Sequence, residues 1–495
     1  MEYLLGIDVG TSGTKSAVFT SDGTLVAEAT ASYPLYQPEN GWAEQDPNDW
    51  WRAVCETLRA VTEQVPAHRI CAVGLSGQMH GTVMLDEQGN AIGRAIIWCD
   101  GRTGEECREI ESRVGRERLI LRTGCPAITG FTAESLLWLR KHEPERYARC
   151  RRVLLPKDYV RYRLTGALAM DASDASGTQL LDTGRRVWSE EVAEALDLPL
   201  SFFPRVCESA ELVGTVTAEA ARLTGLACGT PVAGGAADNA AAAVGCGVAR
   251  PGTAFVTIGT SGVICAETAR PLLNERGSVQ TFCSAIPNEW HAMGSTQASG
   301  LSMSWFRRNF APTLSYAELD ALAREVPIGA ERLLYFPALM GELNPVFDPN
   351  ARGAFVGLSA LHGTGHLARA VMEGVVYSIY SNFLEFHTLG AEIDKMVLCG
   401  GGAKSRLWRE ILADVCNVPI SLTASAECAV LGAAILAGTA VGVYASIPEG
   451  SDRAVRERDV ILPDGAAHAR YERVYGVFRE LHGNLRQTFA ALKSI

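Results

Sequence analysis

The sequence lacks any apolar run long enough to span a bilayer. Its most apolar window, residues 429 to 440, is short and rich in Gly and Ala, whereas a membrane helix needs about 20 apolar residues. The first residues, MEYLLGIDVG, enter a predicted strand directly, without a basic segment or a cleavage site. The sequence therefore predicts neither membrane insertion nor a signal peptide.

Paired cysteines are also absent. The 14 cysteines are scattered singly, without Cys-x-x-Cys pairs or histidines at metal-ligand spacing. This pattern argues against a zinc site and against a disulfide framework. Reduced thiols in a cytoplasmic protein are the simplest interpretation.

Positive charge is not in excess either. Lysine and arginine number 45 against 56 aspartates and glutamates, which gives a formal net charge of −11. A chain with this balance is not expected to bind nucleic acid or an anionic membrane through bulk charge. Any phosphate would have to be bound by a local arrangement of donors.

What the sequence does contain is the composition of a large folded protein. Its 495 residues are 47% hydrophobic and 20% charged, and one domain usually takes roughly 100 to 200 residues. Strand-like and helix-like periodicities alternate along the chain, which predicts an α/β fold. We expect two lobes, residues 1–245 and residues 246–495.

A glycine-rich turn occurs twice. Gly10-Thr11-Ser12-Gly13 lies between two apolar strands, and Gly259-Thr260-Ser261-Gly262 repeats this pattern about half a chain later. Small residues in such a turn let backbone N–H groups and hydroxyls approach a phosphate. The alternative is a hairpin turn in which glycine only relieves backbone strain. Two copies favour a nucleotide bound between two similar lobes.

Charged residues accompany these turns. Asp8 precedes the first turn, where it is suited to hold Mg²⁺ directly or through water, and Lys15 follows it with a positive charge for a phosphate. Asp238 stands at the predicted start of a small-residue helix, shortly after Gly234 and Gly235, which would admit a substrate closely. Phosphoryl transfer to a hydroxyl uses a carboxylate that accepts the proton, and Asp238 is suited to this role. A plain helix N-cap is the alternative.

Four further stretches carry polar groups near predicted strand ends. The turn Gln78-Met79-His80 offers an amide and an imidazole to a polyhydroxylated ligand, although a lone histidine is more often structural. The glycine run 400–405 would let a nucleotide approach the backbone. Residues 98–102 and 157–159 are equally well explained as buried ion pairs or turns.

In this order, the motifs resemble the FGGY carbohydrate kinases, and most closely the xylulose-phosphorylating branch of that family. The resemblance covers nearly the whole chain. It implies two actin-like lobes of the ribonuclease H-like type, as in the actin, Hsp70 and hexokinase superfamily, flanking a catalytic cleft. Matching stretches include GIDVGTSGTK, GLSGQMHG, IIWCDGRT, LLPKDYVRYRLTG, DASDASGT, VAGGAADNAA, TIGTSGV and LCGGGAKSRLW.

The resemblance implies ATP- and Mg²⁺-dependent phosphorylation of D-xylulose to its 5-phosphate in pentose catabolism. Asp238 would be the catalytic base, and Asp8 would serve the metal and the phosphates. The sugar would contact Met79, His80, Asp238 and Asn239. The nucleotide would contact Gly10, Thr11, Ser12, Lys15, Gly259, Thr260, Ser261, Gly401, Gly402, Ala403, Lys404 and Ser405.

Two departures from the family pattern bear on the substrate. Gly341-Glu342-Leu343-Asn344-Pro345 replaces a common Gly-Glu-Arg-Thr-Pro and loses a charge near the cleft, and Ala236 and Ala237 replace glycines before Asp238. Kinases for D-ribulose, L-xylulose or an alditol therefore stay open as alternatives. From another class, a non-catalytic ATP-gated sugar-binding protein stays open as well. A homodimer is a family-level expectation only.

Overall fold

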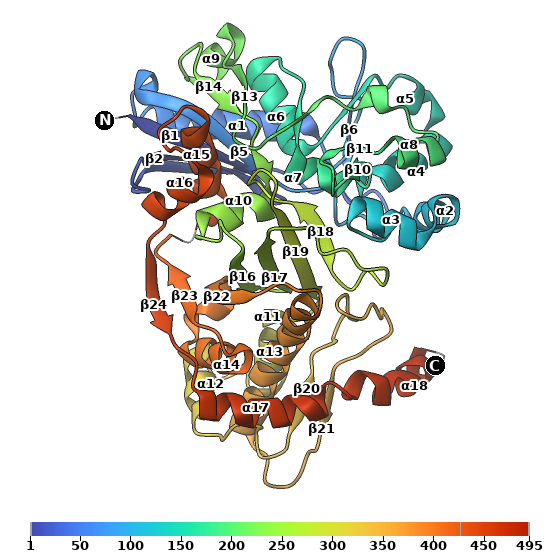
Figure 1. Cartoon of the computed structure of the whole chain (residues 1–495), viewed down its shortest axis with the longest axis vertical. Coiled ribbons are helices and arrows are strands. Elements are labelled where there is room, and N and C mark those ends of the chain that lie inside the picture. Colours follow the sequence, from blue (N-terminus) through green and yellow to red (C-terminus); the bar gives the residue numbers. More distant parts are fainter. Residues whose placement is uncertain (1, 426, 494–495) are drawn as a thin grey trace.

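The protein consists of two stacked lobes, each built around a seven-stranded sheet (Figure 1). A computed structural model describes residues 2–425 and 427–493. The upper sheet has the order β13 (Leu212–Thr215), β14 (Pro231–Ala233), β5 (Ile70–Gly77), β1 (Tyr3–Val9), β2 (Gly13–Thr20) and β3 (Leu25–Ser32), with β15 (Ala236–Ala237) also on β5. The lower sheet has the order β18 (Gln280–Cys283), β19 (Trp290–Thr296), β17 (Gly262–Thr268), β16 (Gly252–Ile258), β22 (Ile393–Cys399), β23 (Ile420–Thr423) and β24 (Glu457–Ile461).

The two sheets repeat one topology. In the upper lobe β1 runs antiparallel to β2, with Val9 opposite Thr14, and parallel to β5. In the lower lobe β16 runs antiparallel to β17, with Ile258 opposite Gly262, and parallel to β22. The duplication predicted from the two glycine turns is therefore confirmed, and each turn connects the corresponding pair of strands.

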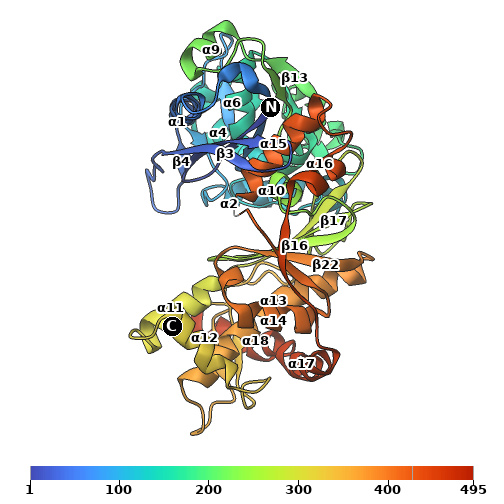
Figure 2. The same ribbon diagram turned by 90° about the vertical axis from the view of Figure 1, so that its left-hand side faces the viewer.

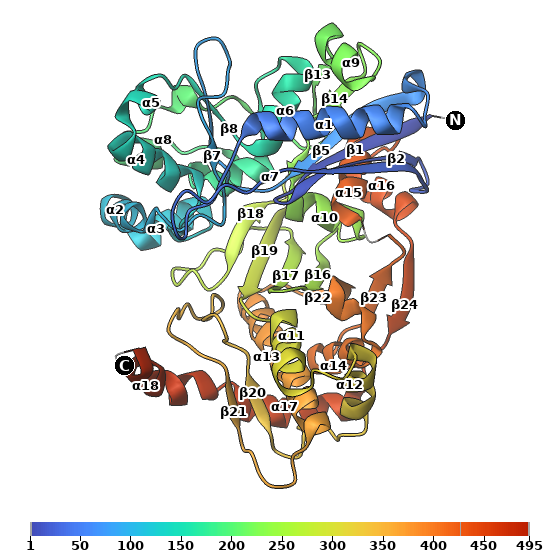
Figure 3. The ribbon, with the colours of Figure 1, turned by 180° about the vertical axis from the view of Figure 1, so that it is seen from behind.

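Helices and short strand pairs complete the upper lobe. The helix α1 (Pro47–Thr62) starts at Asp46, whose side chain accepts from the Asn48 N–H group at 2.9 Å, and its apolar stripe covers the upper sheet (Figure 3). The other helices are α2 (Gly104–Val114), α3 (Arg116–Thr123), α4 (Thr132–His142), α5 (Pro144–Ala148), α6 (Pro156–Thr165), α7 (Ala172–Ala175), α8 (Glu190–Ala195), α9 (Ala218–Thr224) and α10 (Asp238–Gly245). The strand pairs are β4 (Glu44–Gln45) with β7 (Ala95–Ile96), β6 (Val83–Leu85) with β8 (Arg152–Leu154), β9 (Met170–Asp171) with β12 (Val206–Cys207), and β10 (Leu181–Asp182) with β11 (Val187–Trp188).

The lower lobe buries its largest apolar cluster around α13, a helix of 25 residues. Two helices near the C-terminal end, α17 and α18, both pack on this cluster through aromatic residues such as Tyr471 and Phe489. The last two residues of the chain lie outside the described part. The elements are α11 (Gly300–Phe310), α12 (Tyr316–Arg324), α13 (Thr364–Thr388), α14 (Arg406–Cys416), α17 (Gly465–Phe478), α18 (Leu481–Lys493) and the pair β20 (Leu334–Phe336) with β21 (Ala354–Val356).

Two helices from the second half of the chain return to the upper lobe. Helix α15 (Cys428–Ala440), red in the figures, lies against β1 and β5 of the upper sheet, and α16 (Ile447–Ala454) packs on α15 and α10 (Figures 1 and 2). Close packing requires glycine here, because a Cβ atom on Gly74 would lie 1.9 Å from the Ala433 carbonyl oxygen. A boundary near residue 245 stays a prediction, but the chain crosses between the lobes again around α15 and α16.

Among the described residues, no helix is long and apolar enough to cross a membrane.

Candidate active site

The ends of three strands meet at one edge of the upper sheet. Val9 of β1 and Ala237 of β15 both pair with Gly77 of β5, and all three strands run in the same direction. The residues at or just beyond these ends are therefore gathered in one place, as at the binding edge of other α/β sheets. They are Asp8, Gly10, Met79, His80, Asp238 and Asn239.

Side chains from four other segments hold the first glycine turn. The Gln45 amide donates to the Thr11 carbonyl at 2.7 Å, the Gln78 amide donates to Gln45 at 2.7 Å, and the Trp98 indole donates to the Thr11 hydroxyl at 2.9 Å. The Tyr33 hydroxyl donates to the Gly10 carbonyl. The Gly10 and Thr11 carbonyls thus both accept hydrogen bonds from the protein. Ser12, at the tip of the turn, is exposed to solvent. Of these contacts, the sequence indicated only the neighbourhood of Gln78 and Trp98.

The Asp8 carboxylate lies at the end of β1 with one oxygen unsatisfied. Its Oδ1 atom is buried and has no hydrogen-bond partner. Burial raises the pKa of Asp8, while the Ser76 hydroxyl and the Lys15 ammonium oppose this shift. A hard divalent cation takes carboxylate oxygens as ligands and would satisfy this atom. The residues present therefore fit a magnesium site at Asp8.

Asp238 is the first residue of α10. Its Oδ1 atom accepts from the Asn239 N–H group at 2.7 Å. The N-cap of α10 is Ala237, without a side-chain hydrogen bond, so the interpretation of Asp238 as a plain N-cap is wrong. Burial and the neighbouring Asp8 carboxylate raise the pKa of Asp238 to about 7. The second oxygen carries no contact within the helix turn. Asp238 is thus a carboxyl group poised near neutrality at the sheet edge.

His80 is held rigidly in an unusual backbone conformation, with φ at +70°. Its Nδ1 atom lies 2.6 Å from the Gly177 carbonyl oxygen, which can only accept, so Nδ1 carries the proton. The ring stacks on Phe131, and burial lowers the pKa of His80 to about 4. At neutral pH the imidazole is uncharged, and its Nε2 atom is a hydrogen-bond acceptor. The adjacent Met79 sulfur accepts from the Asn239 amide at 3.8 Å.

Lys15 is paired with carboxylates. Its ammonium group lies 2.7 Å from Glu427, just before α15, and 3.6 Å from Glu28 on β3. Burial would lower the pKa of Lys15, but the neighbouring carboxylates, chiefly Glu427, raise it above its usual value. The side chain therefore ties β2 to the returning helix, and contact with a phosphate stays a prediction.

The second glycine turn abuts the start of α11. The Gly259 carbonyl accepts from the Gly300 N–H group at 2.7 Å, and the Thr260 carbonyl accepts from Ser299 at 3.1 Å and from Leu301 at 3.2 Å. A Cβ atom on Gly300 would lie 2.4 Å from the Gly259 oxygen. The turn is fixed to the helix by these contacts, and the exposed Ser261 lies at its tip.

A cavity of about 600 Å³ opens beside this second turn. Among the predicted nucleotide residues, it is lined by Gly259, Thr260, Gly401, Gly402, Lys404 and Ser405. Ala403 instead packs against the lower core. The other lining residues, which the sequence did not predict as nucleotide contacts, are Ile258, Gly300, Leu301, Met303, Ser304, Tyr316, Ala317, Asp320, Met372 and Trp408.

The mixture of lining groups suits a nucleoside. Apolar side chains offer faces for a base, and a few polar groups converge on one side. The Ser405 hydroxyl donates to Asp320 at 2.7 Å, and burial raises the pKa of this carboxyl group. Gly402 is required because a Cβ atom there would lie 2.5 Å from the Ile258 side chain, whereas Gly401 faces open space.

Two of the weaker candidate stretches are buried ion pairs. Arg102 lies 2.7 Å from Asp100, and Lys157 lies 2.7 Å from Asp158. The Arg102 guanidinium also stacks on Trp42, 3.6 Å from the ring centroid. The structural interpretation of both stretches is therefore confirmed.

The Gly341–Pro345 segment, expected near the cleft, is bound within the lower lobe. Glu342 accepts from Ser378 of α13 at 3.0 Å, and the Asn344 side chain accepts from Ser295 of β19 at 3.2 Å. Burial raises the pKa of Glu342 to about 7. The segment thus lies beside the strand that borders the second glycine turn, and its hydrogen bonds run to β19 and α13.

Two family models match the chain. The model described as the N-terminal domain of the FGGY family of carbohydrate kinases matches residues 3–245, and the C-terminal domain model matches residues 254–441. The chain belongs to the FGGY family of carbohydrate kinases. This membership establishes the two-lobed kinase fold and the class of enzyme.

Within the FGGY family, the chain is similar to curated xylulose kinases over its full length. It is 37% identical to the Escherichia coli (strain K12) xylulose kinase, over 97% of this chain and 99% of that one. It is 35% identical to the Bacillus subtilis (strain 168) xylulose kinase, over 100% of this chain and 99% of that one. The crystal structure of xylulose kinase from Rhodospirillum rubrum superposes with a TM-score of 0.92 at 31% identity, covering 99% of this chain and 100% of that one.

Proposed function

We propose that this FGGY kinase transfers the γ-phosphoryl group of ATP to the terminal hydroxyl of D-xylulose, with D-xylulose 5-phosphate and ADP as products. The full-length similarity to xylulose kinases supports the substrate. The observation that carries the chemistry is Asp238, a carboxyl group with a pKa of about 7 beside Asp8, Met79 and His80 at one sheet edge. No other predicted site residue combines this place with a pKa near neutrality.

Asp238 would accept the proton of the attacking hydroxyl. A general base works best when its pKa lies near the operating pH, because it is then both partly ionised and basic enough. The Asn239 N–H group holds Oδ1, which leaves Oδ2 to face the sugar. The proton therefore passes to Oδ2 as the hydroxyl oxygen attacks phosphorus and the bond to the ADP oxygen breaks.

The sugar would be oriented by groups on the same edge. Because His80 donates from Nδ1 to Gly177, its Nε2 atom accepts from a sugar hydroxyl. The Met79 thioether and the Asn239 amide form the neighbouring wall. A neutral imidazole suits this task, since it adds no charge beside two carboxyl groups.

ATP would place its nucleoside in the 600 Å³ cavity and its phosphates between the two glycine turns. Backbone N–H groups of the turns offer donors to the phosphates. Asp8 would hold Mg²⁺ through its unsatisfied Oδ1 atom, and the ion would offset phosphate charge. Approach of the lobes would then bring the sugar hydroxyl to the γ-phosphate and exclude water.

The test is ADP formation from Mg·ATP with a panel of ketopentoses, aldoses, glycerol and alditols. We expect D-xylulose to exceed the other sugars, and Asp238→Asn to lower kcat by roughly 10² to 10⁴-fold with D-xylulose affinity retained. Asp394→Asn, at an exposed position of β22, is the matched control and should keep wild-type activity. Activity on another sugar would refute the substrate, and an active Asp238→Asn variant would refute the base. The homodimer stays a prediction, to be measured by light scattering.

A further inference from the structure

A closed cluster of buried charges lies behind Asp238. The Lys157 ammonium group lies 2.7 Å from Asp158, 2.6 Å from Asp171 and 3.0 Å from Asp174, and Arg161 lies 2.8 Å from Asp158. All five side chains are fully buried. The three carboxylates are close enough together to hold a metal ion, but the ammonium group already lies among them.

The charges of this cluster nearly balance. Two cations face three carboxyl groups, and burial raises the pKa of Asp174 well above its usual range. The two cations thus offset most of the negative charge that the three carboxyl groups could carry, which lowers the large cost of burying unpaired charge. Removing either cation would leave buried carboxylates unpaired, so the five side chains are held together as one block.

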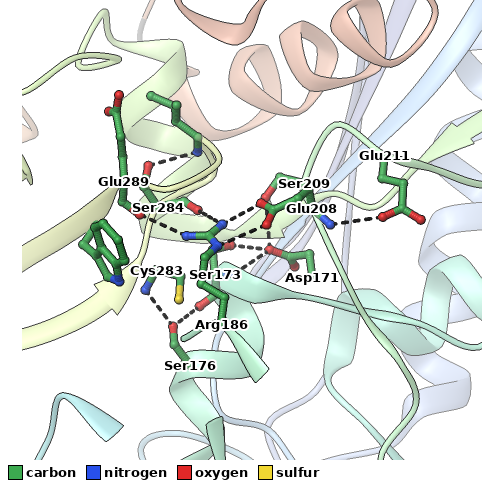
Figure 4. Close-up of polar contacts among 12 residues, drawn as sticks. Asp171, Ser173, Ser176, Arg186, Glu208, Ser209, Glu211, Cys283, Ser284 and Glu289 are labelled. Carbon is green, nitrogen blue, oxygen red and sulfur yellow. Dashed lines mark hydrogen bonds and ion pairs between the residues drawn. The ribbon is translucent and has the colours of Figure 1, made fainter. Parts of the chain in front are cut away.

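This block is connected to the backbone immediately before Asp238. The Ser173 hydroxyl, at the start of α7, donates to Asp171 (Figure 4). It also accepts from the Ala237 N–H group at 3.0 Å. Arg161 donates to the Gly234 carbonyl. The segment before Asp238 is thus held from behind at Gly234 and at Ala237, and Ala237 is the residue directly before Asp238.

The segment before β15 contains two consecutive glycines, Gly234 and Gly235, and no bulky side chain can be accommodated at Gly235. Gly235 has φ at +82°, and a Cβ atom on it would lie 2.5 Å from the Leu75 carbonyl oxygen. A strand with two consecutive glycines has few side-chain contacts of its own to set its position. The pairing of β15 with β5 and the hydrogen bonds from Ser173 and Arg161 therefore define where the Asp238 carboxyl group lies.

The other side of α7 contacts the lower lobe. The Ser176 hydroxyl donates to the Ser173 carbonyl at 2.6 Å and accepts from the Cys283 N–H group of β18 at 3.1 Å (Figure 4). Nearby, Arg186 donates to the carbonyls of Ser284 at 3.3 Å and Glu289 at 3.0 Å. Helix α7 is accordingly fixed to the hairpin β18–β19 and is a firm support for Ser173.

We propose that Ser173 is a positioning residue for phosphoryl transfer: by linking the Lys157–Asp171 pair to the Ala237 N–H group, it sets the place of the Asp238 carboxyl group. The role of Asp238 in this statement rests on the proposed function. Ser173 itself touches no reacting atom. It acts through the peptide group that precedes the base, and a small displacement of a base lowers the rate of proton transfer without removing substrate contacts.

Ser209 provides a matched control. It is buried like Ser173 and donates to the same Asp171 oxygen, at 3.1 Å (Figure 4). The Ala237 N–H group, however, donates to Ser173. Ser173→Ala and Ser209→Ala each remove one donor from Asp171. Only the first also removes the acceptor of the Ala237 N–H group.

The experiment compares both variants with the wild type by steady-state kinetics and by amide hydrogen exchange of the peptide covering residues 234–239. We expect Ser173→Ala to lower kcat at least tenfold with the KM for D-xylulose within twofold, and Ser209→Ala to keep kcat within twofold. Exchange at Ala237 should rise at least tenfold in Ser173→Ala only. Equal kcat losses in both variants, or unchanged exchange at Ala237, would overturn the proposal.

The exchange measurement does not depend on catalysis, so it separates this proposal from the proposed function. If the wild type phosphorylates no sugar, the proposed function fails, while a selective rise at Ala237 still shows that Ser173 holds the strand. If Ser173→Ala does not fold, Ser173→Thr, which retains the hydroxyl, is compared with Ser173→Val, of similar shape. A kcat no higher in the threonine than in the valine variant would overturn the proposal.

Discussion

The His80 imidazole lies flat against the Phe131 ring, with centroids 3.6 Å apart and planes 14° apart. This stack and the bond to Gly177 enclose the ring, and burial lowers the pKa of His80 to about 4. In the unfolded chain the group titrates near 6.5. Between pH 4 and pH 6.5, His80 therefore binds a proton in the unfolded chain but not in the folded protein.

The first prediction concerns stability and pH. Because the folded pKa is lowered, the contribution of His80 is present above pH 6.5 and is lost as the pH falls toward 4. Between pH 7 and pH 5 this linkage amounts to about 2 kcal/mol. Urea unfolding of the wild type and of His80→Gln should show that the variant loses less stability over this range. A parallel decline would show that His80 is protonated in the folded state.

The second prediction concerns the pH dependence of the reaction. Burial and Asp8 raise the pKa of Asp238 to about 7, so the carboxyl group is protonated, and inactive as a base, below that value. We expect kcat/KM for the sugar to rise with pH through an inflection near 7 and to level off above it. The profile is measured from pH 5.5 to 8.5 at saturating Mg·ATP. A flat profile across this range would exclude Asp238 as the titrating base.

The third prediction concerns the nucleoside cavity. Gly401 lines it, and the nearest atom to a Cβ on this residue would be the Ile258 oxygen at 3.9 Å, so a larger side chain extends into open space. Gly401→Leu should raise the KM for ATP at least tenfold and leave the melting temperature and the sugar KM unchanged. The control is Gly476→Leu, at an exposed and open position of α17. Unaltered ATP kinetics in Gly401→Leu would place the nucleoside elsewhere.

The fourth prediction concerns the returning helix α15. A Cβ atom on Gly74 would lie 1.9 Å from the Ala433 carbonyl oxygen. This contact is between the backbones of β5 and α15, and neither can shift without disturbing its sheet or helix. Gly74→Ala should destabilise the protein by about 3 kcal/mol, at the upper end for overpacking. Gly104→Ala, which meets nothing within 4 Å, should have little effect. Equal denaturation midpoints for the two variants would mean that α15 does not rest on β5 in solution.

Much of the fold follows from local patterns. Alternating apolar residues and glycine turns predict β1, β2, β16 and β17, and their duplication predicts two similar sheets, because strand periodicity and turn chemistry are short-range properties. The same holds for α1, which begins at a capping aspartate followed by proline. The residues that carry the candidate chemistry, Asp8, His80 and Asp238, are also visible in the sequence, since each follows a predicted strand.

Contacts between distant segments were not visible. Nothing in the sequence pairs Lys15 with Glu427, seats α15 on the upper sheet, or directs Gln45 to the Thr11 carbonyl. The residues that complete the nucleoside cavity, such as Tyr316 and Asp320, lie on a helix whose sequence shows only an ordinary capping box.

The sequence by itself determined which side chains have suitable chemistry and which segments become strands and helices. Only the tertiary structure decided what those side chains do to one another. Asp238 differs from any other aspartate at a helix start because burial and Asp8 raise its pKa, and His80 differs from an ordinary histidine because Phe131 and Gly177 enclose it. Desolvation and the proximity of other charges depend on residues that packing brings together from distant parts of the chain. A local sequence pattern does not contain this information.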